Sequence, residues 1–329
     1  MQAIGGAGGQ PTVWAVHDGK PGMASQVMGL AEAVGGQIVE KRLAVRAPWR
    51  CLMPQFWINP LAAPGPSGDS LAPPWPELLI ACGRNTIAPA LAAKRASQGR
   101  MLWVHIQDPR YARSKADLLI VPRHDPAQGE NVFPTLGAVH RVTPARLAEG
   151  ARSLAPRVAG LPRPLVAVLI GGNNRVYRLT QARMAELADQ LAALARRGFG
   201  LMVTPSRRTG ALGARLLEER LKGLPAFIWD GSGDNPYFGM LGLADAIVVT
   251  ADSVSMVSEA AATGKPVHVA MLAGGSDKFA QFHAAMNAAG ITRLFRGEIE
   301  RWSYAAPDDT ARAAEAIHDR LARHLAEVA

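Results

Sequence analysis

The stretch AIVVTADSVSMVSEAAATGKPVHVAM, from Ala246 to Met271, decides the fold class of this sequence. Two short apolar runs, Ala246 to Thr250 and Pro266 to Met271, flank the helical pattern VSMVSEAAATG. Neither run alternates polar with apolar residues, so each is typical of a strand that is buried on both faces of a parallel sheet. The stretch therefore predicts one strand, helix and strand of an α/β domain.

The same alternation recurs along most of the chain. In the first half, the runs predicted as strands are Thr12 to His17, Gln37 to Val45, Glu77 to Gly83, Met101 to Gln107 and Asp117 to Val121. In the second half, they are Leu165 to Gly171, Gly200 to Thr204, Ala226 to Trp229, Ala246 to Thr250 and Pro266 to Met271. This pattern predicts two Rossmann-like, doubly wound parallel-sheet domains.

The prolines and glycines of LAPRVAGLPRP separate the two halves. We expect a flexible tail at residues 1–10, an N-terminal domain at 11–160 and a C-terminal domain at 161–306. Residues 307–329 carry Ala314, Ile317 and Leu321 at helical spacing, which predicts a C-terminal helix that packs back on the N-terminal domain.

Composition narrows the possible locations and partners. The net charge of +9 suits an anionic partner, such as a nucleotide or an anionic membrane surface, but no long run of like charges indicates a nucleic-acid partner. The apolar runs are far shorter than the roughly 20 residues of a membrane-spanning helix. With no signal peptide and only Cys51 and Cys82, we expect a cytoplasmic protein, and peripheral contact with the inner membrane face stays open. No metal site and no cofactor are predicted.

In open parallel sheets, ligands bind beyond the carboxyl ends of the strands. Six loops at these positions are rich in glycine and polar residues, and they begin at His17, Gly83, Gln107, Gly171, Thr204 and Thr250. Such residues also form ordinary turns and helix caps, so their number is stronger evidence than any one loop. The turn HDGKPG matches neither GxxxxGK[ST] nor GxGxxG, which argues against a P-loop ATPase and an ordinary dinucleotide binder.

Several blocks together resemble a known family. In chain order they are HDGKPGMASQVMGLAEAV, ACGRNTIAPAL, VHIQDPR, VAVLIGGNN, VTPSRRTG and DNPYFGMLGLADAIVVTADSVSMVSEAAATGKPV. They resemble the bacterial relatives of the plant mitochondrial-fission (elongated-mitochondria) family of glycosyltransferase-like proteins. The second half also resembles GT-B glycosyltransferases, especially the N-acetylglucosaminyltransferase that acts on the lipid-linked peptidoglycan precursor.

This resemblance implies a GT-B fold, with two domains facing across a cleft, and a nucleotide sugar that is a substrate and not a cofactor. It implies that Glu259 holds the ribose. The implied donor-binding residues are Gly171, Gly172, Asn173, Asn174, Ser206, Arg207, Asn235, Thr250, Ser253, Val254, Ser255, Glu259 and Gln281. The acceptor-binding candidates are Gly19, Lys20, Gly22, Arg84, Asn85 and Asp108.

The first turn departs from the GGTGGH of the better-known enzymes, which leaves the catalytic base open. Asp18 and His17 both have suitable chemistry, and we prefer Asp18. His17 could instead be a strand-end histidine whose ring nitrogens are satisfied by neighbouring groups.

The expected function is metal-independent transfer of a sugar from a nucleotide sugar to a hydroxyl acceptor, for which a lipid-linked or cell-envelope glycan acceptor is one option. A non-catalytic interaction protein and a nucleotide-sugar epimerase are the alternatives. Trp49, Met53, Phe56 and Trp57 crowd a short helical stretch within Ala47 to Leu61. This stretch predicts either core packing, which we favour, or membrane contact.

Overall fold

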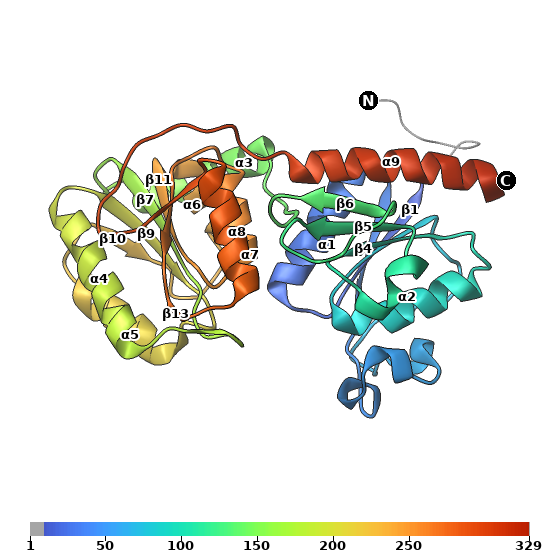
Figure 1. Ribbon diagram of the computed structural model, residues 1–329. Helices are drawn as coiled ribbons and strands as arrows, with labels where there is room; N and C mark the ends of the chain where they lie inside the picture. Colours follow the sequence, from blue (N-terminus) through green and yellow to red (C-terminus); the bar gives the residue numbers. More distant parts are fainter. Residues whose placement is uncertain (1–9, 329) are drawn as a thin grey trace. The chain divides into compact units, whose positions relative to one another are not determined.

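The computed structural model of the protein describes residues 10–328 and divides them into two units (Figure 1). Residues 10–141 and 308–328 form the first unit, and residues 142–307 form the second. Each unit is built on a six-stranded sheet whose paired strands are all parallel. The expected tail at residues 1–10 lies, apart from Gln10, outside the described residues.

The sheet of the first unit has the strand order β2-β1-β3-β4-β5-β6. Its strands are β1 (Thr12–His17), β2 (Gln37–Arg42), β3 (Leu78–Cys82), β4 (Leu102–Ile106), β5 (Leu118–Pro122) and β6 (Val132–Thr135). Its helices are α1 (Pro21–Val34), α2 (Arg84–Ala96) and α9 (Asp309–Val328), with the 3-10 turns η1 (Trp49–Cys51), η2 (Pro54–Phe56), η3 (Pro60–Ala62) and η4 (Arg110–Lys115).

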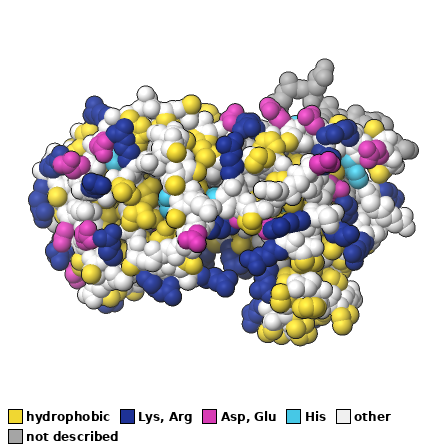
Figure 2. All heavy atoms as spheres, viewed as in Figure 1, with side chains coloured by type: hydrophobic (Ala, Val, Ile, Leu, Met, Phe, Trp, Pro, Cys, Tyr) yellow, Lys and Arg dark blue, Asp and Glu magenta, His cyan; other side chains and the backbone are white. Residues whose placement is uncertain are grey.

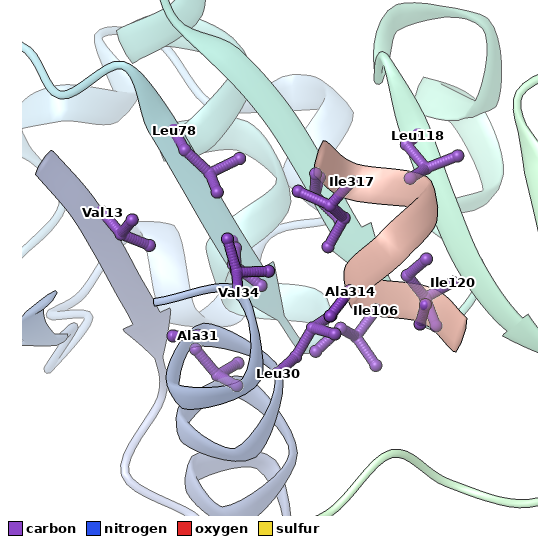
Figure 3. Packing of buried hydrophobic residues seen from close by; sticks show 14 of the residues in the cluster. Val13, Leu30, Ala31, Val34, Leu78, Ile106, Leu118, Ile120, Ala314 and Ile317 are labelled. Atoms are coloured by element: carbon purple, nitrogen blue, oxygen red, sulfur yellow. The ribbon is translucent and has the colours of Figure 1, made fainter. Parts of the chain in front are cut away.

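Alternate side chains of β1 enter two different cores. Val13 and Ala15 pack with α1 and α9, whereas Trp14 and Val16 pack on the side of α2. Figure 3 shows the first of these cores, in which Ile317 of α9 lies among residues of α1 and the sheet. Burial on both faces explains why the central strands β3, β4 and β5 are largely apolar, whereas the edge strand β2 contains charged, exposed residues.

Helix α9 is tied to the first unit by its N-terminal end as well as by its apolar face. The Asp309 carboxylate, which is 5% exposed, accepts hydrogen bonds from the backbone N–H groups of Leu136 (2.8 Å) and Gly137 (3.0 Å). These contacts join the last helix to the chain that follows β6, 172 residues or more earlier in the sequence.

The sheet of the second unit has the order β10-β9-β7-β11-β12-β14. Its strands are β7 (Leu165–Ile170), β9 (Gly200–Pro205), β10 (Ala226–Ile228), β11 (Ala246–Thr250), β12 (Val267–Ala270) and β14 (Thr292–Leu294), and β8 (Tyr177–Arg178) pairs with β13 (Ala273–Gly274). Its helices are α3 (Pro144–Val158), α4 (Gln181–Arg196), α5 (Gly210–Leu221), α6 (Tyr237–Leu243), α7 (Val254–Ala261) and α8 (Asp277–Ala288). Helices α4 and α5 cover one face of the sheet, and α6 and α7 lie on the other (Figure 1).

The boundary between the units lies at Arg141, earlier than the expected residue 160. The difference concerns α3, which packs on α6 of the second unit. A Cβ atom at Gly150 would lie 2.6 Å from the Gly239 nitrogen, and one at Gly242 would lie 2.4 Å from the Leu147 oxygen. Only glycine permits this approach of two helix backbones. The Pro/Gly-rich segment therefore lies inside the second unit, where Leu154 to Val158 belong to α3 and only the residues from Ala159 onward follow the helix.

All ten runs predicted as strands contain strands, so the predicted fold class is confirmed. The sequence did not indicate β6 and β14, which lie at the sheet edges. Strand β6 contains Pro134, and β14 has three residues, of which only Thr292 is buried. Edge strands that are short, or that contain proline, lack the continuous apolar pattern of the central strands.

The stretch Ala47 to Leu61 forms three separate 3-10 turns, where the sequence predicted one short helix. Its aromatic and methionine side chains divide between two environments. Trp57 is buried and Trp49 packs against the same small core, whereas Met53 and Phe56 are 52% and 63% exposed. Core packing, the expectation that we favoured, therefore holds for the two tryptophans only.

Within residues 10–328, no helix combines the length and the apolar character that crossing a bilayer would need.

The core contact of α9 provides a stability test. We expect Ile317→Ala to lower the free energy of unfolding by about 2 to 5 kcal/mol, because it removes a fully buried side chain and leaves a cavity. Urea denaturation followed by tryptophan fluorescence measures the effect. Asp319→Ala, at an exposed position of the same helix, is the matched control and should change stability by less than about 0.5 kcal/mol. Equal effects of the two substitutions would show that α9 does not depend on this core.

Candidate functional site

The loop after β7 is held to the loop after β11 by two hydrogen bonds. The backbone N–H of Gly171 donates to Thr250 Oγ1 at 2.7 Å, and that of Gly172 donates to Asp252 Oδ2 at 3.0 Å. A Cβ atom at Gly171 would lie 2.3 Å from the Asp252 carboxylate, so no larger residue fits there without a shift. These two N–H groups already have acceptors within the protein.

Asp252 is the centre of this network, and the sequence analysis did not include it among the site residues. Its side chain is fully buried and accepts from the Thr250 hydroxyl (2.7 Å) and from Arg208 Nη1 (2.7 Å), besides the Gly172 N–H. A buried carboxylate needs such partners, because burial otherwise strongly disfavours its charge. An acidic residue two positions after a buried strand was the sequence signal that could have identified it.

The loop after β9 divides its two arginines between different environments. Ser206 Oγ donates to the Gly171 carbonyl at 2.8 Å, which joins this loop to the one after β7. Arg208 turns inward to Asp252, whereas Arg207 is exposed and forms no hydrogen bond or ion pair within residues 10–328. Arg175, in the adjacent loop after β7, is likewise exposed and unpaired among the described residues. Arg207 was predicted, and Arg175 was not.

Asn173 and Asn174 use their side chains to build the loop that contains them. Asn173 Oδ1 accepts from the Leu179 N–H at 2.9 Å, and Asn174 Oδ1 accepts from the N–H groups of Val176 and Tyr177. Asn174 Nδ2 donates to the carbonyl of Asp252 at 3.0 Å. The structure thus gives both residues local partners.

Helix α7 begins at the same edge of the second sheet. Ser253 caps the helix, because its Oγ accepts from the Met256 N–H at 3.3 Å. Val254 and Ser255 form the first turn and are partly exposed. The positive end of the helix dipole therefore lies beside the loops that carry Arg175 and Arg207.

Glu259 lies further along α7 and is 6% exposed. The Tyr237 hydroxyl at the start of α6 donates to Glu259 Oε2 at 2.6 Å. Burial, and then the charge of Glu259, raises the pKa of the Tyr237 phenol well above 10, so the tyrosine stays a hydrogen-bond donor at neutral pH. Tyr237 is a further residue that the sequence analysis missed, since its pairing depends on how α6 packs.

Two predicted donor-binding residues, Asn235 and Gln281, take no part in the Asp252 network or in the Tyr237–Glu259 hydrogen bond. Asn235 is exposed, and its Oδ1 accepts from the Tyr237 N–H at 3.1 Å. Gln281 is exposed on α8 and has no hydrogen-bond partner within residues 10–328. The structure does not bring Gln281 into the network around Asp252.

In the first unit, His17 ends β1 and is 3% exposed. Its Nδ1 accepts from the Gly19 N–H at 3.0 Å, which places the ring proton on Nε2, and Nε2 donates to Glu40 Oε1 at 2.8 Å. Both ring nitrogens are therefore engaged, which agrees with the alternative of a strand-end histidine whose ring nitrogens are satisfied by neighbouring groups. Nδ1 could accept a proton from a substrate only after its hydrogen bond with the Gly19 N–H was broken.

Asp18 follows His17 and forms an ion pair with Lys20. The carboxylate is 4% exposed, whereas the Lys20 side chain is 64% exposed. Asp18 lies close to the end of β3, because a Cβ atom at Gly83 would be 3.9 Å from Asp18 Cγ. Burial, and next the charge of Asp18, raises the pKa of the Cys82 thiol, so this cysteine stays protonated.

The turns around Asp18 require unusual backbone conformations. Gly19 and Gly83 have φ angles of 81° and 102°, which favour glycine. Gly22 lies in the first turn of α1, and its carbonyl accepts from Gln26 Nε2 at 3.0 Å. Arg84 and Asn85 begin α2, and Arg84 Nη2 donates to the Leu52 carbonyl at 3.2 Å.

Asp108 has a local role that its position in the sequence did not indicate. Its two oxygens accept from Arg113 Nε at 2.7 Å and Nη2 at 2.6 Å, and the Arg110 N–H donates to it at 2.8 Å. The hydrogen bond from Arg113 holds the pKa of the Asp108 carboxyl below its usual value. These bonds close the turn η4 and occupy most of the carboxylate.

No three His, Cys, Asp or Glu side chains of the described part of the chain are grouped as metal ligands would be. Each unit carries its own set of candidate loops. In the second unit, a buried network around Asp252 supports two arginines without a partner among residues 10–328, the start of α7 and the pair Tyr237–Glu259. In the first unit, a glycine turn holds a buried aspartate.

Comparisons with known proteins place the chain in a family. Residues 21–321 match the family described as mitochondrial fission ELM1. Mitochondrial fission protein ELM1 of Arabidopsis thaliana is 35% identical over 275 residues, which are 75% of this chain but only 64% of the plant protein. An uncharacterized protein of Rickettsia prowazekii (strain Madrid E) is 25% identical over 353 residues, covering 93% of this chain and 97% of that protein.

Among solved structures, the UDP-GlcNAc 2-epimerase of Methanocaldococcus jannaschii has a TM-score of 0.56 and covers 94% of this chain and 99% of its own. Its sequence identity is 10%, so the likeness shows the fold alone. The chain belongs to the mitochondrial fission ELM1 family, and its two parallel-sheet units have a GT-B type of fold, which they share with UDP-GlcNAc 2-epimerases.

Proposed function

We propose that the protein is a glycosyltransferase that moves a sugar from a nucleotide sugar to a hydroxyl acceptor without a catalytic metal ion. The observation that carries this proposal is the buried Glu259 carboxylate on α7, at the carboxyl edge of the second sheet. The Tyr237 hydroxyl donates to one of its oxygens. A carboxylate only accepts hydrogen bonds, and in this proposal its oxygens accept from the two hydroxyl groups of a bound ribose.

Two arginines supply the charge that a nucleoside diphosphate needs. Arg175 and Arg207 are exposed on neighbouring loops and have no partner among residues 10–328. The start of α7 adds the positive end of a helix dipole. Arginine forms bidentate hydrogen bonds to phosphate oxygens, so both groups would stabilise the departing diphosphate. The predicted donor residues Gly171, Gly172, Asn173 and Asn174 would shape this site, since their polar groups are bonded within the protein.

Asp18 is the catalytic base in this proposal. It would take the proton of the acceptor hydroxyl as that oxygen forms a bond to the anomeric carbon. The bond from this carbon to the diphosphate oxygen breaks, and its electron pair leaves with the diphosphate. The engaged ring nitrogens of His17 favour Asp18 over His17, and the bonds of Asp108 to Arg113 argue against an acceptor-binding role for Asp108.

Two other functions retain support from particular findings. The Arabidopsis relative is a mitochondrial fission protein by name, which favours a non-catalytic interaction protein. The fold is shared with UDP-GlcNAc 2-epimerases, which favours conversion of the sugar itself. The unpaired arginines and the buried Glu259 favour an active nucleotide-sugar enzyme over a scaffold, because a scaffold has no need of them.

The ribose site can be tested by binding. We expect UDP to bind to the wild-type protein. Glu259→Ala should raise the Kd for UDP by about tenfold or more, because the ribose hydroxyls lose a charged acceptor. Isothermal titration calorimetry with UDP, GDP, CDP and ADP measures the Kd for each base. Glu219→Ala, at an exposed position of α5, is the matched control. Absence of binding for all four nucleotides would contradict the proposal.

The catalytic base can be tested by turnover. We expect Asp18→Asn to lower the transfer rate of labelled sugar by about 10² to 10⁴-fold while the Kd of UDP stays unchanged, because asparagine cannot take the proton. UDP-GlcNAc, with a cell-envelope lipid extract as acceptor, is the first donor to use. A loss in His17→Gln but not in Asp18→Asn, with both variants folded, would assign the base to His17. An altered sugar formed without any acceptor would identify an epimerase.

A further inference from the structure

The segment of residues 49–62, here called the apolar lobe, carries an unusual concentration of exposed apolar side chains. Within residues 10–328, nine large hydrophobic side chains are exposed, and four of them lie between residues 52 and 58. These four are Leu52 (43% exposed), Met53 (52%), Phe56 (63%) and Ile58 (85%). Figure 2 shows hydrophobic side chains gathered on this lobe, at the lower right. Single exposed apolar residues need no explanation, but such a cluster does.

The lobe has an ordered interior, so its exposed residues are not a core that failed to form. Trp57 is buried with Ala63 and Ala88 of the first unit. Trp49 Nε1 donates to the Ile58 carbonyl at 2.8 Å, and Trp57 Nε1 donates to the Leu52 carbonyl at 3.3 Å. Both indoles thus brace the backbone that presents the exposed residues.

The charged residues of the sequence around the lobe are arginines, and the first acidic residue that follows is Asp69. The sequence from Leu43 to Gly68 contains Arg46 and Arg50 but no aspartate or glutamate. The Arg46 guanidinium lies 5.4 Å from the centre of the Trp49 ring, and Arg84 donates to the Leu52 carbonyl at 3.2 Å. Lys and Arg side chains are visible beside the apolar group in Figure 2. Apolar side chains rimmed by cations match the interface of an anionic bilayer, where acyl chains lie beneath negative headgroups.

We propose that the apolar lobe docks the protein on an anionic lipid bilayer. Leu52, Met53, Phe56 and Ile58 enter the headgroup region, and Arg46 and Arg50 contact lipid phosphates. The surface does not depend on the enzymatic proposal. Arg84, which donates to the Leu52 carbonyl, follows Gly83, and Gly83 lies close to Asp18. This proximity indicates a lipid-borne acceptor, a consequence that does rest on the proposed function.

Cosedimentation with vesicles tests the docking surface in the full chain. We expect binding to phosphatidylcholine vesicles that contain phosphatidylglycerol, little binding to phosphatidylcholine alone, and weaker binding as salt is raised. Phe56→Ser with Ile58→Ser should weaken binding by about tenfold or more. Arg50→Gln should weaken it by about fivefold, because one cation near the surface is lost. Leu212→Ser, at a 63% exposed position of the second unit, is the matched control and should bind as the wild type does.

Cys51 offers a local readout of the same event. It is exposed at η1, whereas Cys82 is buried, so a thiol-reactive environment-sensitive dye labels Cys51 selectively. We expect its emission to shift to the blue when anionic vesicles are added. Binding without this shift would place the membrane contact elsewhere on the protein.

Other outcomes would overturn the proposal. Equal binding to neutral and anionic vesicles would show that the arginines do not bind lipid phosphates as proposed. If no vesicle binds, and the double substitution converts a dimer to a monomer in analytical ultracentrifugation, the lobe is a contact between copies of this chain. UDP titrations of the same variants separate membrane docking from the proposed enzymatic function. The lobe variants should keep the wild-type Kd for UDP, and Glu259→Ala should keep vesicle binding.

Discussion

Burial of parallel strands on both faces is the constraint on which the rest of this structure depends. Such strands cannot be joined by hairpins, so each connection crosses back over a face of the sheet as a helix or a longer segment. All strands of one sheet then end at the same edge, and all the loops that follow them gather there. This is why Gly171 and Ser206, and likewise Gly172 and Asp252, are joined by hydrogen bonds although they are distant in sequence.

Three buried carboxylates then determine what these edges can do. Asp252 is saturated by Gly172, Thr250 and Arg208, and its function is to hold three loops together. Glu259 accepts from the hydroxyl of Tyr237, which lies on another helix. Asp18 is paired with Lys20, whose side chain is mostly exposed. The same residue type is therefore structural in the first case and suited to a ligand or a proton in the other two.

The sequence was sufficient for the central strands, because continuous apolar runs are a local signal of burial on both faces. It also predicted Asp18, Glu259 and Arg207 as site residues through their positions after strands or within helix α7 and through a family resemblance, and their roles stay predictions. It could not identify Asp252, Tyr237 or Arg175, since their importance depends on which loops become neighbours. The unit boundary was misplaced for the same reason, because the close packing of α3 on α6 at Gly150 and Gly239 involves residues far apart in the chain.

The sequence by itself determined the α/β class, most of the strands, the family and the loops that are candidates for a functional site. Periodicity and local motifs depend only on residues close together in the sequence. Only the tertiary structure decided which polar groups remain available. It showed that His17, Asp108, Asn173 and Asn174 are satisfied by nearby groups, and that Arg207 and Arg175 have no partner among residues 10–328. It also turned Phe56 and Ile58 outward while it buried Trp57. Hydrogen bonding and burial depend on the whole set of neighbours, which a linear pattern does not contain.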